Sequence, residues 1–322
     1  MKIIYTGGHT TGLSPDAVQA SINAVAWERY MRESQPGYLS ARDEFFVKQQ
    51  QANEMVYVWD EDSNVGAFEE TDEQADISNS DTRIGNQKTA RQKKYVKQIP
   101  ISWEAFKTDM VGKRERIGQQ IGDRAKLTQD KNTILETYGD AFAGTYNTTP
   151  DGDALASNSH TTLTGVNVDN LETGVLNADN LWTLVQSLAN QKAQDGEAGS
   201  QVFEGVVVPF ILYKTVKETM NSQLVPFSGE NQVNLFDTDY GTVKIAASIF
   251  LGSTYNAATN ANTSYSIISS NHMVTRRVLD GLNMDMIEPK YTANDTYVER
   301  ARYAETRFFE SWTGYAGSNG TV

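Results

Sequence analysis

Three histidines and many carboxylates are the side chains of this 322-residue chain that could do acid–base chemistry. His9, His160 and His272 lie far apart, and none has a second histidine at the four-residue spacing with which a helix binds zinc. We interpret His160, in "SNSHTT", as a loop histidine whose nitrogens are satisfied or exposed. The chain has no cysteine, which excludes disulfides, thiolate metal ligands and cysteine nucleophiles.

Other catalytic and ligand-binding patterns are incomplete. The "DGD" at 151–153 resembles the start of a calcium loop but lacks the later positions, so it predicts an ordinary turn. Neither a phosphate-binding glycine loop nor a Gly-x-Ser-x-Gly elbow occurs. The acids are numerous enough for a glycosidase-like pair, so an acid-rich hydrolase stays an alternative. We expect no catalytic residue, cofactor or metal site.

The charges are strongly segregated between residues 60 and 100. Nine acids and no base occupy 60–82, among them Asp72, Glu73 and Asp76. The segment "RIGNQKTARQKKYVKQIP" (83–100) then carries six cations and no acid; these are Arg83, Lys88, Arg91, Lys93, Lys94 and Lys97. With a net charge of −13, the whole chain repels phosphate, and the segment lacks interleaved aromatics for base stacking. The pattern favours pairing between these charges over nucleic-acid binding.

The elements around these charges predict a long β-hairpin. "EMVYVW" (54–59) and "YVKQIPIS" (95–102) are rich in β-formers, and Gly66, "SNSD" and Gly85 supply turns between them. Opposite charges on facing strands would stabilise such an arm, at about 0.2–1 kcal/mol per pair. A solvated acidic loop is the alternative. Because the arm has too few apolar residues for its own core, it needs another surface to lie on.

The rest of the sequence predicts a mixed α+β chain. A helix is expected from Ser14 toward Glu33, and a second helical piece over 41–51. A helix of roughly 30 residues, hence about 45 Å, is expected to end at Gly144, with Gly118 and Gly122 allowing close approach of a neighbour. Further helices are predicted near 177–196 and 209–222, and strands near 203–209, 240–252, 264–270, 284–291 and 296–318.

This order of elements resembles the major capsid protein of tailed bacteriophages, the Hong Kong 97-type fold. The motifs behind the resemblance are "IPISWEAF" before the long helix, "NLWTLVQSLANQKAQDGE" before "VVVPFILY", and the closing "RFFESWTGYAGSNG". The resemblance implies an N-terminal arm over 1–53, an extended hairpin loop over 54–100, and a spine helix with peripheral domain over 101–150. An axial domain over 151–285 and return strands of the peripheral domain over 286–322 complete it.

The resemblance also implies a function. It is that of a major head protein, assembled in the host cytoplasm, whose hexamers and pentamers form the icosahedral shell of a virion. The implied partners are a separate scaffolding protein, a portal and a decoration protein, with double-stranded DNA enclosed without specific binding and no membrane involved. Because the extended loop in this family lies over a neighbouring subunit, the charged residues of the arm would be assembly contacts. An encapsulin-type nanocompartment shell shares the fold and is the nearest alternative.

Overall fold

The computed structural model describes residues 15–63, 65, 70, 82–102, 104, 113–223, 234–287 and 296–321. Its helices are α1 (Pro15–Met31), α3 (Lys113–Glu136), α4 (Ala178–Ala189), α5 (Tyr213–Asn221) and α6 (Leu235–Asp239), with short 3-10 turns η1 (Phe210–Leu212) and η2 (Ile249–Leu251). The long strands are β2 (Val56–Asp62), β3 (Ile84–Arg91), β4 (Lys93–Ser102), β11 (Val274–Ile287) and β12 (Thr296–Phe309). The short ones are β1 (Lys48–Gln51), β5 (His160–Thr161), β6 (Asn167–Val168), β7 (Leu171–Glu172), β8 (Gly205–Pro209), β9 (Lys244–Ser248), β10 (Tyr265–Ile268) and β13 (Tyr315–Ser318). No described helix is long and apolar enough to cross a membrane.

The chain divides into two compact units. Unit 1 comprises 1–33, 92–129 and 278–305, and unit 2 comprises 34–91, 130–277 and 306–322. The C-terminal stretch 286–322, expected as one returning part, is therefore divided between both units. Its last strand, β13, lies in the five-stranded sheet of unit 2, which has the order β7-β13-β10-β8-β9.

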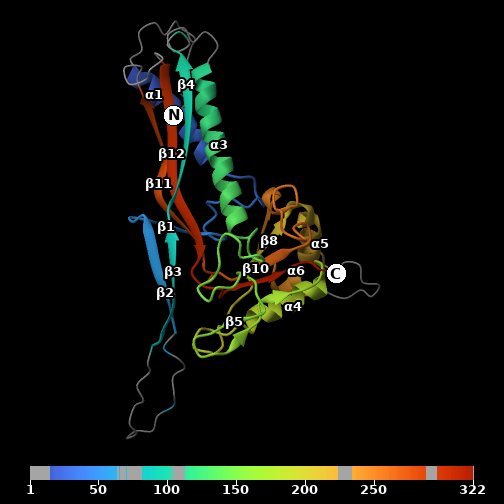
Figure 1. Ribbon diagram of the computed structural model, residues 1–322. Coiled ribbons are helices and arrows are strands. Elements are labelled where there is room, and N and C mark those ends of the chain that lie inside the picture. The colour runs from blue at the N-terminus through green and yellow to red at the C-terminus, as the bar shows by residue number, and fades with distance from the viewer. Residues whose placement is uncertain are drawn as a thin grey trace. The chain divides into compact units, whose positions relative to one another are not determined.

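In unit 1, helices pack on one face of paired strands. β4 and β12 are antiparallel over ten residues, and Figure 1 shows α3 running beside them. Alternate residues of β12 point toward the helices and pack against α1 and α3. The core consists of Ile22, Ala26, Tyr30, Ile101, Ile117, Ile121, Leu282, Met284, Tyr297, Ala301 and Tyr303. The backbone of α1 approaches Gly118 and Gly122 closely, as the sequence predicted, since a Cβ at Gly122 would lie 2.3 Å from the carbonyl oxygen of Ala26.

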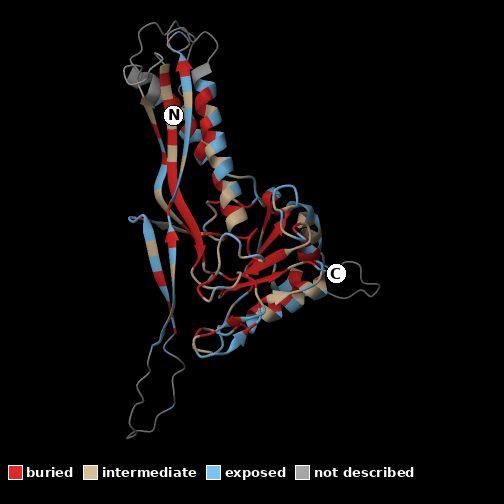
Figure 2. Ribbon diagram, in the orientation of Figure 1, coloured by how far each residue is buried: buried red, intermediate tan, exposed pale blue. Residues whose placement is uncertain are grey.

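In unit 2, the three central strands of the five-stranded sheet, β13, β10 and β8, are buried along their whole length (Figure 2). α4 covers one side with Leu181, Leu184, Val185 and Leu188, and it begins at Asn177, whose side chain accepts the Asn180 N–H. Opposite it, a second core gathers large residues such as Phe309 and Trp312. The helices and strands predicted over 177–222 and 240–270 are confirmed at their centres.

Two predicted helical stretches are wrong. The segment 41–51 forms turns and then strand β1. The Asp43 carboxylate accepts the Phe45 N–H, which favours a turn, and the next residues, Phe46 and Val47, are both buried. The long helix ends at Glu136, not Gly144, and turns follow over 137–143. There the Asp140 carboxylate accepts the backbone N–H groups of Thr145, Tyr146 and Asn147, which draws the chain out of the helix.

Candidate functional site

An antiparallel hairpin is present, formed by β2 and β3, which both belong to unit 2. Its return strand was predicted wrongly, because 95–102 lies in β4 and pairs with β12, and Gly85 lies within β3 rather than in a turn. Its register places Val56 opposite Arg91, Trp59 opposite Lys88, Asp60 opposite Gln87 and Asp62 opposite Ile84. In this described part, no cation stands directly opposite an acid. The expectation that opposite charges face each other is therefore wrong for these pairs. The cations pair with apolar residues of β2, and the acids Asp60 and Asp62 pair with uncharged residues of β3.

Apart from Lys88, the expected assembly residues fall into three groups. Asp72, Glu73 and Asp76 lie outside the described residues. Arg83 and Arg91 are exposed at the two ends of β3, and the Arg83 N–H donates to Ser63 Oγ over 2.7 Å. Lys93 and Lys94 are exposed on β4 in unit 1, where they stand opposite Glu305 and Ala304 of β12. The basic segment is thus split at Gln92 between two units, so the return arm of the hairpin ends at Arg91.

Lys88 alone among these cations points inward. Its ammonium donates to the Thr148 hydroxyl and, over 3.0 Å, to the Thr149 carbonyl oxygen. Burial lowers its pKa, which the carboxylates of Asp151 and Glu61 oppose. Lys88 therefore fixes β3 to the 148–151 loop.

An aromatic contact holds the base of the hairpin from another direction. Trp59 lies 4.5 Å from Phe308 between ring centroids, and its indole N–H donates to the Glu310 carbonyl oxygen over 3.3 Å. Arg277 stacks 3.6 Å from the Tyr57 ring and pairs with Glu54 over 3.0 Å. Both polar and aromatic contacts therefore hold the base of the hairpin against the rest of unit 2.

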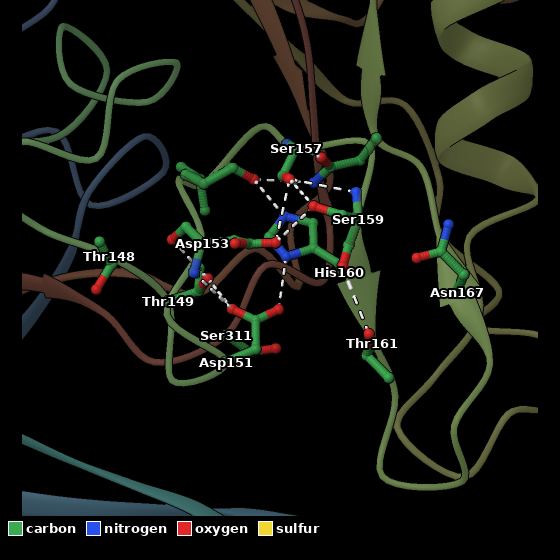
Figure 3. A network of polar contacts seen from close by, with 12 residues as sticks. Thr148, Thr149, Asp151, Asp153, Ser157, Ser159, His160, Thr161, Asn167 and Ser311 are labelled. Atoms are coloured by element: carbon green, nitrogen blue, oxygen red, sulfur yellow. Dashed lines mark hydrogen bonds and ion pairs between the residues drawn. The ribbon is translucent and has the colours of Figure 1, made fainter.

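The polar network next to Lys88 centres on His160 (Figure 3). Its Nδ1 lies 2.7 Å from Asp151 Oδ2, its Nε2 lies 3.2 Å from the Leu155 carbonyl oxygen, and its ring stacks on Trp312. Each ring nitrogen of His160 thus has a polar partner, one in the Asp151 carboxylate and one in the backbone. The hydrogen bonds from His160 and Thr149 hold the pKa of Asp151 below its usual value against the opposing effect of burial.

Asp151, Asp153 and His160 present ligand atoms within 4.8 Å of one another, the kind of group that can hold a metal ion. In this arrangement, however, Asp153 accepts hydrogen bonds from Ser157 and Ser159, and Asp151 faces the His160 ring. The three side chains therefore act as a hydrogen-bond network that ties the "DGD" turn to β5. Sequence reasoning found the turn but missed the network, because Trp312 is far away along the chain.

His272 has a structural role as well. Its Nε2–H donates to the Phe45 carbonyl oxygen over 2.7 Å, and its Nδ1 accepts the Val274 N–H over 3.2 Å. Burial lowers its pKa to about 4, so the ring is neutral. Neither described histidine contacts a hydroxyl that could serve as a nucleophile.

Unit 1 contains a groove of about 650 Å³ between α3 and strands β4, β11 and β12. Most of its lining is apolar or aromatic, and its charged lining residues are Lys97 and Arg124; the full lining is Tyr95, Val96, Lys97, Ile99, Gln120, Ile121, Arg124, Ala125, Thr128, Leu282, Ala301 and Tyr303. No acid appears among these residues. Such a surface suits an acidic segment that also carries apolar side chains.

Comparisons with known proteins identify the fold. No family model and no curated protein matches the chain. Among solved structures, the capsid of an empty GTA particle is 9% identical, and the match covers 92% of this chain and 98% of that one with a TM-score of 0.55. For the capsid of cyanophage P-SCSP1u the identity is 12%, the coverage 89% and 90%, and the TM-score 0.54. For the mature capsid of bacteriophage PhiM1 they are 12%, 89% of each chain, and 0.53.

At these identities the likeness is one of fold. It extends over nearly the whole length of both chains in each comparison. The chain therefore has the mixed α+β, Hong Kong 97-type fold of tailed-phage capsid proteins, which confirms the resemblance seen in the sequence.

Proposed function

We propose that this chain is the major capsid protein of a tailed bacteriophage, which self-assembles into the icosahedral head that encloses double-stranded DNA. The observation that carries the proposal is the fold: capsid proteins from three particles match about nine-tenths of the chain, and the chain matches about nine-tenths or more of each of them. The role of the chain is structural, not enzymatic.

The parts of the capsid fold are assigned as follows. Residues 1–53 form the N-terminal arm, 54–100 the extended loop, 101–150 the spine helix and peripheral domain, 151–285 the axial domain and 286–322 the returning strands. The pairing of β2 with β3 supports the loop assignment as far as Arg91, whereas 93–100 pairs with β12 in unit 1. The length of α3 supports the spine assignment. The place of β13 in the sheet of unit 2 supports moving the last residues, from 306 on, to the axial part.

The charged arm is proposed as an assembly contact between subunits. Its candidate residues are Asp72, Glu73, Asp76, Arg83, Lys88, Arg91, Lys93 and Lys94. The groove with Lys97 and Arg124 supports a neighbouring acidic arm as its occupant, because its two cations are exposed and its buried lining residues are apolar or aromatic. Since Lys88 is held within its own subunit, we assign it to seating the arm and the exposed cations to the contact.

The proposed partners follow from a shell. Copies of the chain would form hexamers and pentamers, and a scaffolding protein, a portal and a decoration protein would meet the same shell. Each subunit carries a net charge of −13, so the lining of the head would repel DNA rather than bind it, which suits a container that must be filled.

Sedimentation velocity of the purified full-length chain tests this function. A shell predicts a fast, homogeneous boundary far heavier than one 35.7 kDa subunit. A single boundary at the mass of one subunit, at concentrations from dilute to high, would contradict it and would favour the hydrolase alternative. Particles recovered from phage lysates should also contain nuclease-protected double-stranded DNA; shells that lack it would favour a nanocompartment.

A further inference from the structure

Glu61 is a buried acid between two exposed acids, Asp60 and Asp62. Side chains alternate between the two faces of β2, and Tyr57, Trp59 and Glu61 lie on the less exposed face. Glu61 is 5% exposed, whereas Asp60 and Asp62 are both exposed. The carboxyl group of Glu61 therefore lies between the hairpin and the rest of unit 2.

The groups in contact with this carboxyl are neutral amides. Gln194 Nε2 donates to Glu61 Oε1 over 3.2 Å, and the Asn86 side chain supplies a further hydrogen bond. The other amide atom, Gln194 Oε1, is buried and has no hydrogen-bond partner. A buried acceptor without a donor costs about 1–3 kcal/mol. The missing donor is what a proton on the carboxyl of Glu61 would supply.

The charged groups around Glu61 would not fully compensate a negative charge on its carboxyl group. From β3, Lys88 faces it, but that ammonium already donates to Thr148 and Thr149. From the 148–159 loop comes Asp151, an acid that His160 holds as a carboxylate, with Asp153 beyond it. An ionised Glu61 would thus be a second buried carboxylate beside Asp151.

The remaining element in contact adds no cation toward Glu61. The turn that carries Gln194 also contains Lys192, Asp195 and Glu197, of which Lys192 and Glu197 are exposed and Asp195 is half-buried. The Asp195 carboxylate accepts the Glu197 N–H over 2.9 Å. Gln194 is therefore the side chain through which this turn meets the hairpin.

We propose that Glu61 is held as a neutral acid when the hairpin is seated, paired through its proton with the Gln194 amide, and that loss of this proton loosens the base of the hairpin. The hairpin would then be a proton-sensitive arm whose hinge lies at residues 59–63 and 83–88. This inference concerns the isolated subunit and stands whether or not the chain assembles into a shell.

The electrostatics agree with the geometry. Burial first, and then the negative charge of Asp151, raise the pKa of Glu61 to about 7. The pKa in the seated hairpin is above that of a free glutamate, so seating binds the proton more tightly than release does. Seating is therefore strongest below about pH 4.5, weakens as pH rises from there to about 7, and changes little at higher pH.

Hydrogen–deuterium exchange of the full-length, unassembled chain tests the proposal. After correction for intrinsic exchange rates, amides of 56–62 and 84–91 should lose up to about tenfold in protection for each pH unit between about 4.5 and 7, with little further loss above about 7. Glu61→Gln keeps a neutral amide in the same place, and its protection should not change with pH. Asp62→Asn removes an exposed acid one residue away and should behave as the unmodified chain.

Infrared difference spectra of the unmodified chain minus Glu61→Gln test the same point without relying on exchange. At about pH 6 they should show the band of a protonated carboxylic acid, and this band should vanish by about pH 8. Hairpin protection that is independent of pH in the unmodified chain would overturn the proposal. So would an unchanged pH dependence in Glu61→Gln, its loss in Asp62→Asn, or the absence of the carboxylic-acid band.

Discussion

Two glutamates on β12, Glu299 and Glu305, are both fully buried but differ in what their carboxyl oxygens contact. Glu305 accepts a hydrogen bond from Gln129 over 2.8 Å. Both oxygens of Glu299 are buried without a hydrogen-bond partner, and burial, followed by the charge of Asp285, raises its pKa to about 7. Glu299 is therefore an unfavourable site for a charge inside unit 1.

We expect Glu299→Gln to remove a pH-dependent loss of stability. Because the folded chain binds this proton more tightly than the unfolded chain does, the free energy of unfolding should fall as pH rises from about 4.5 through about 7. At about pH 8 the variant should be more stable than the unmodified chain by about 1–3 kcal/mol, and near pH 4 the two should be equal. Urea denaturation at both pH values measures this.

Glu28→Gln, at an exposed position of α1 in the same unit, is the matched control and should change little at either pH. An equal gain in the control, or a Glu299 variant that is less stable at about pH 8, would contradict the account.

Single residues were the hardest scale to predict from the sequence. The apolar positions of α3 follow from helical periodicity, and Ile117 and Ile121 are buried as expected. His160 gives no such signal, because its burial depends on Trp312, which lies far along the chain, and on Asp151 in a turn. Glu61 is buried because strand alternation places it on the same face as Trp59, but three successive acids at 60–62 do not show in the sequence which of them is buried.

At the scale of elements, two glycines on one face of α3 allow α1 to pack closely against it. Gly118 and Gly122 allow the carbonyl oxygens of Ile22 and Ala26 on α1 to approach the helix. The existence of these helices and of the hairpin strands could be predicted, because periodicity and turn residues act locally. The end of α3 could not, since it depends on how the Asp140 carboxylate meets the amides that follow it.

Gly122→Ala should destabilise unit 1 although alanine favours helices by about 1 kcal/mol over glycine. Its Cβ would lie 2.3 Å from the Ala26 carbonyl oxygen and 2.8 Å from Arg29 Cβ, so α1 must move. We expect a net loss of about 1–3 kcal/mol in the free energy of unfolding, by chemical denaturation.

Asp123→Ala, at the exposed neighbouring position of α3, keeps the gain in helix propensity without the clash and should be neutral or slightly stabilising. If Gly122→Ala were as stable as this control, the close packing of α1 on α3 would be refuted.

At the scale of the whole molecule, the proposed assembly contacts on β4 are exposed cations that lie outside the hydrophobic core. Lys94 and its neighbour Lys93 are exposed on β4, on the chain segment that enters unit 1. An exposed ion pair contributes only about 0–1 kcal/mol, but a shell repeats each contact many times. The split of the basic segment at Gln92 was not predictable, because it follows from which strand each half pairs with.

Reversal of both charges, Lys93→Glu with Lys94→Glu, should prevent or distort shell formation while the subunit stays folded. Circular dichroism checks the fold, and sedimentation measures the shells. Lys214→Glu, at an exposed position in unit 2, is the control and should assemble normally. Intact empty shells from the double variant, with a loss only of DNA content, would instead support the nucleic-acid reading of this segment.

Electron microscopy of the purified full-length chain in negative stain tests the central claim most directly. The account predicts closed, roughly spherical particles of uniform diameter with icosahedral outlines, built from this chain with or without a scaffolding protein. If the micrographs show only separate subunits or open tubes, even when scaffolding protein from the same genome is supplied, this chain is not the shell-forming protein of a phage head.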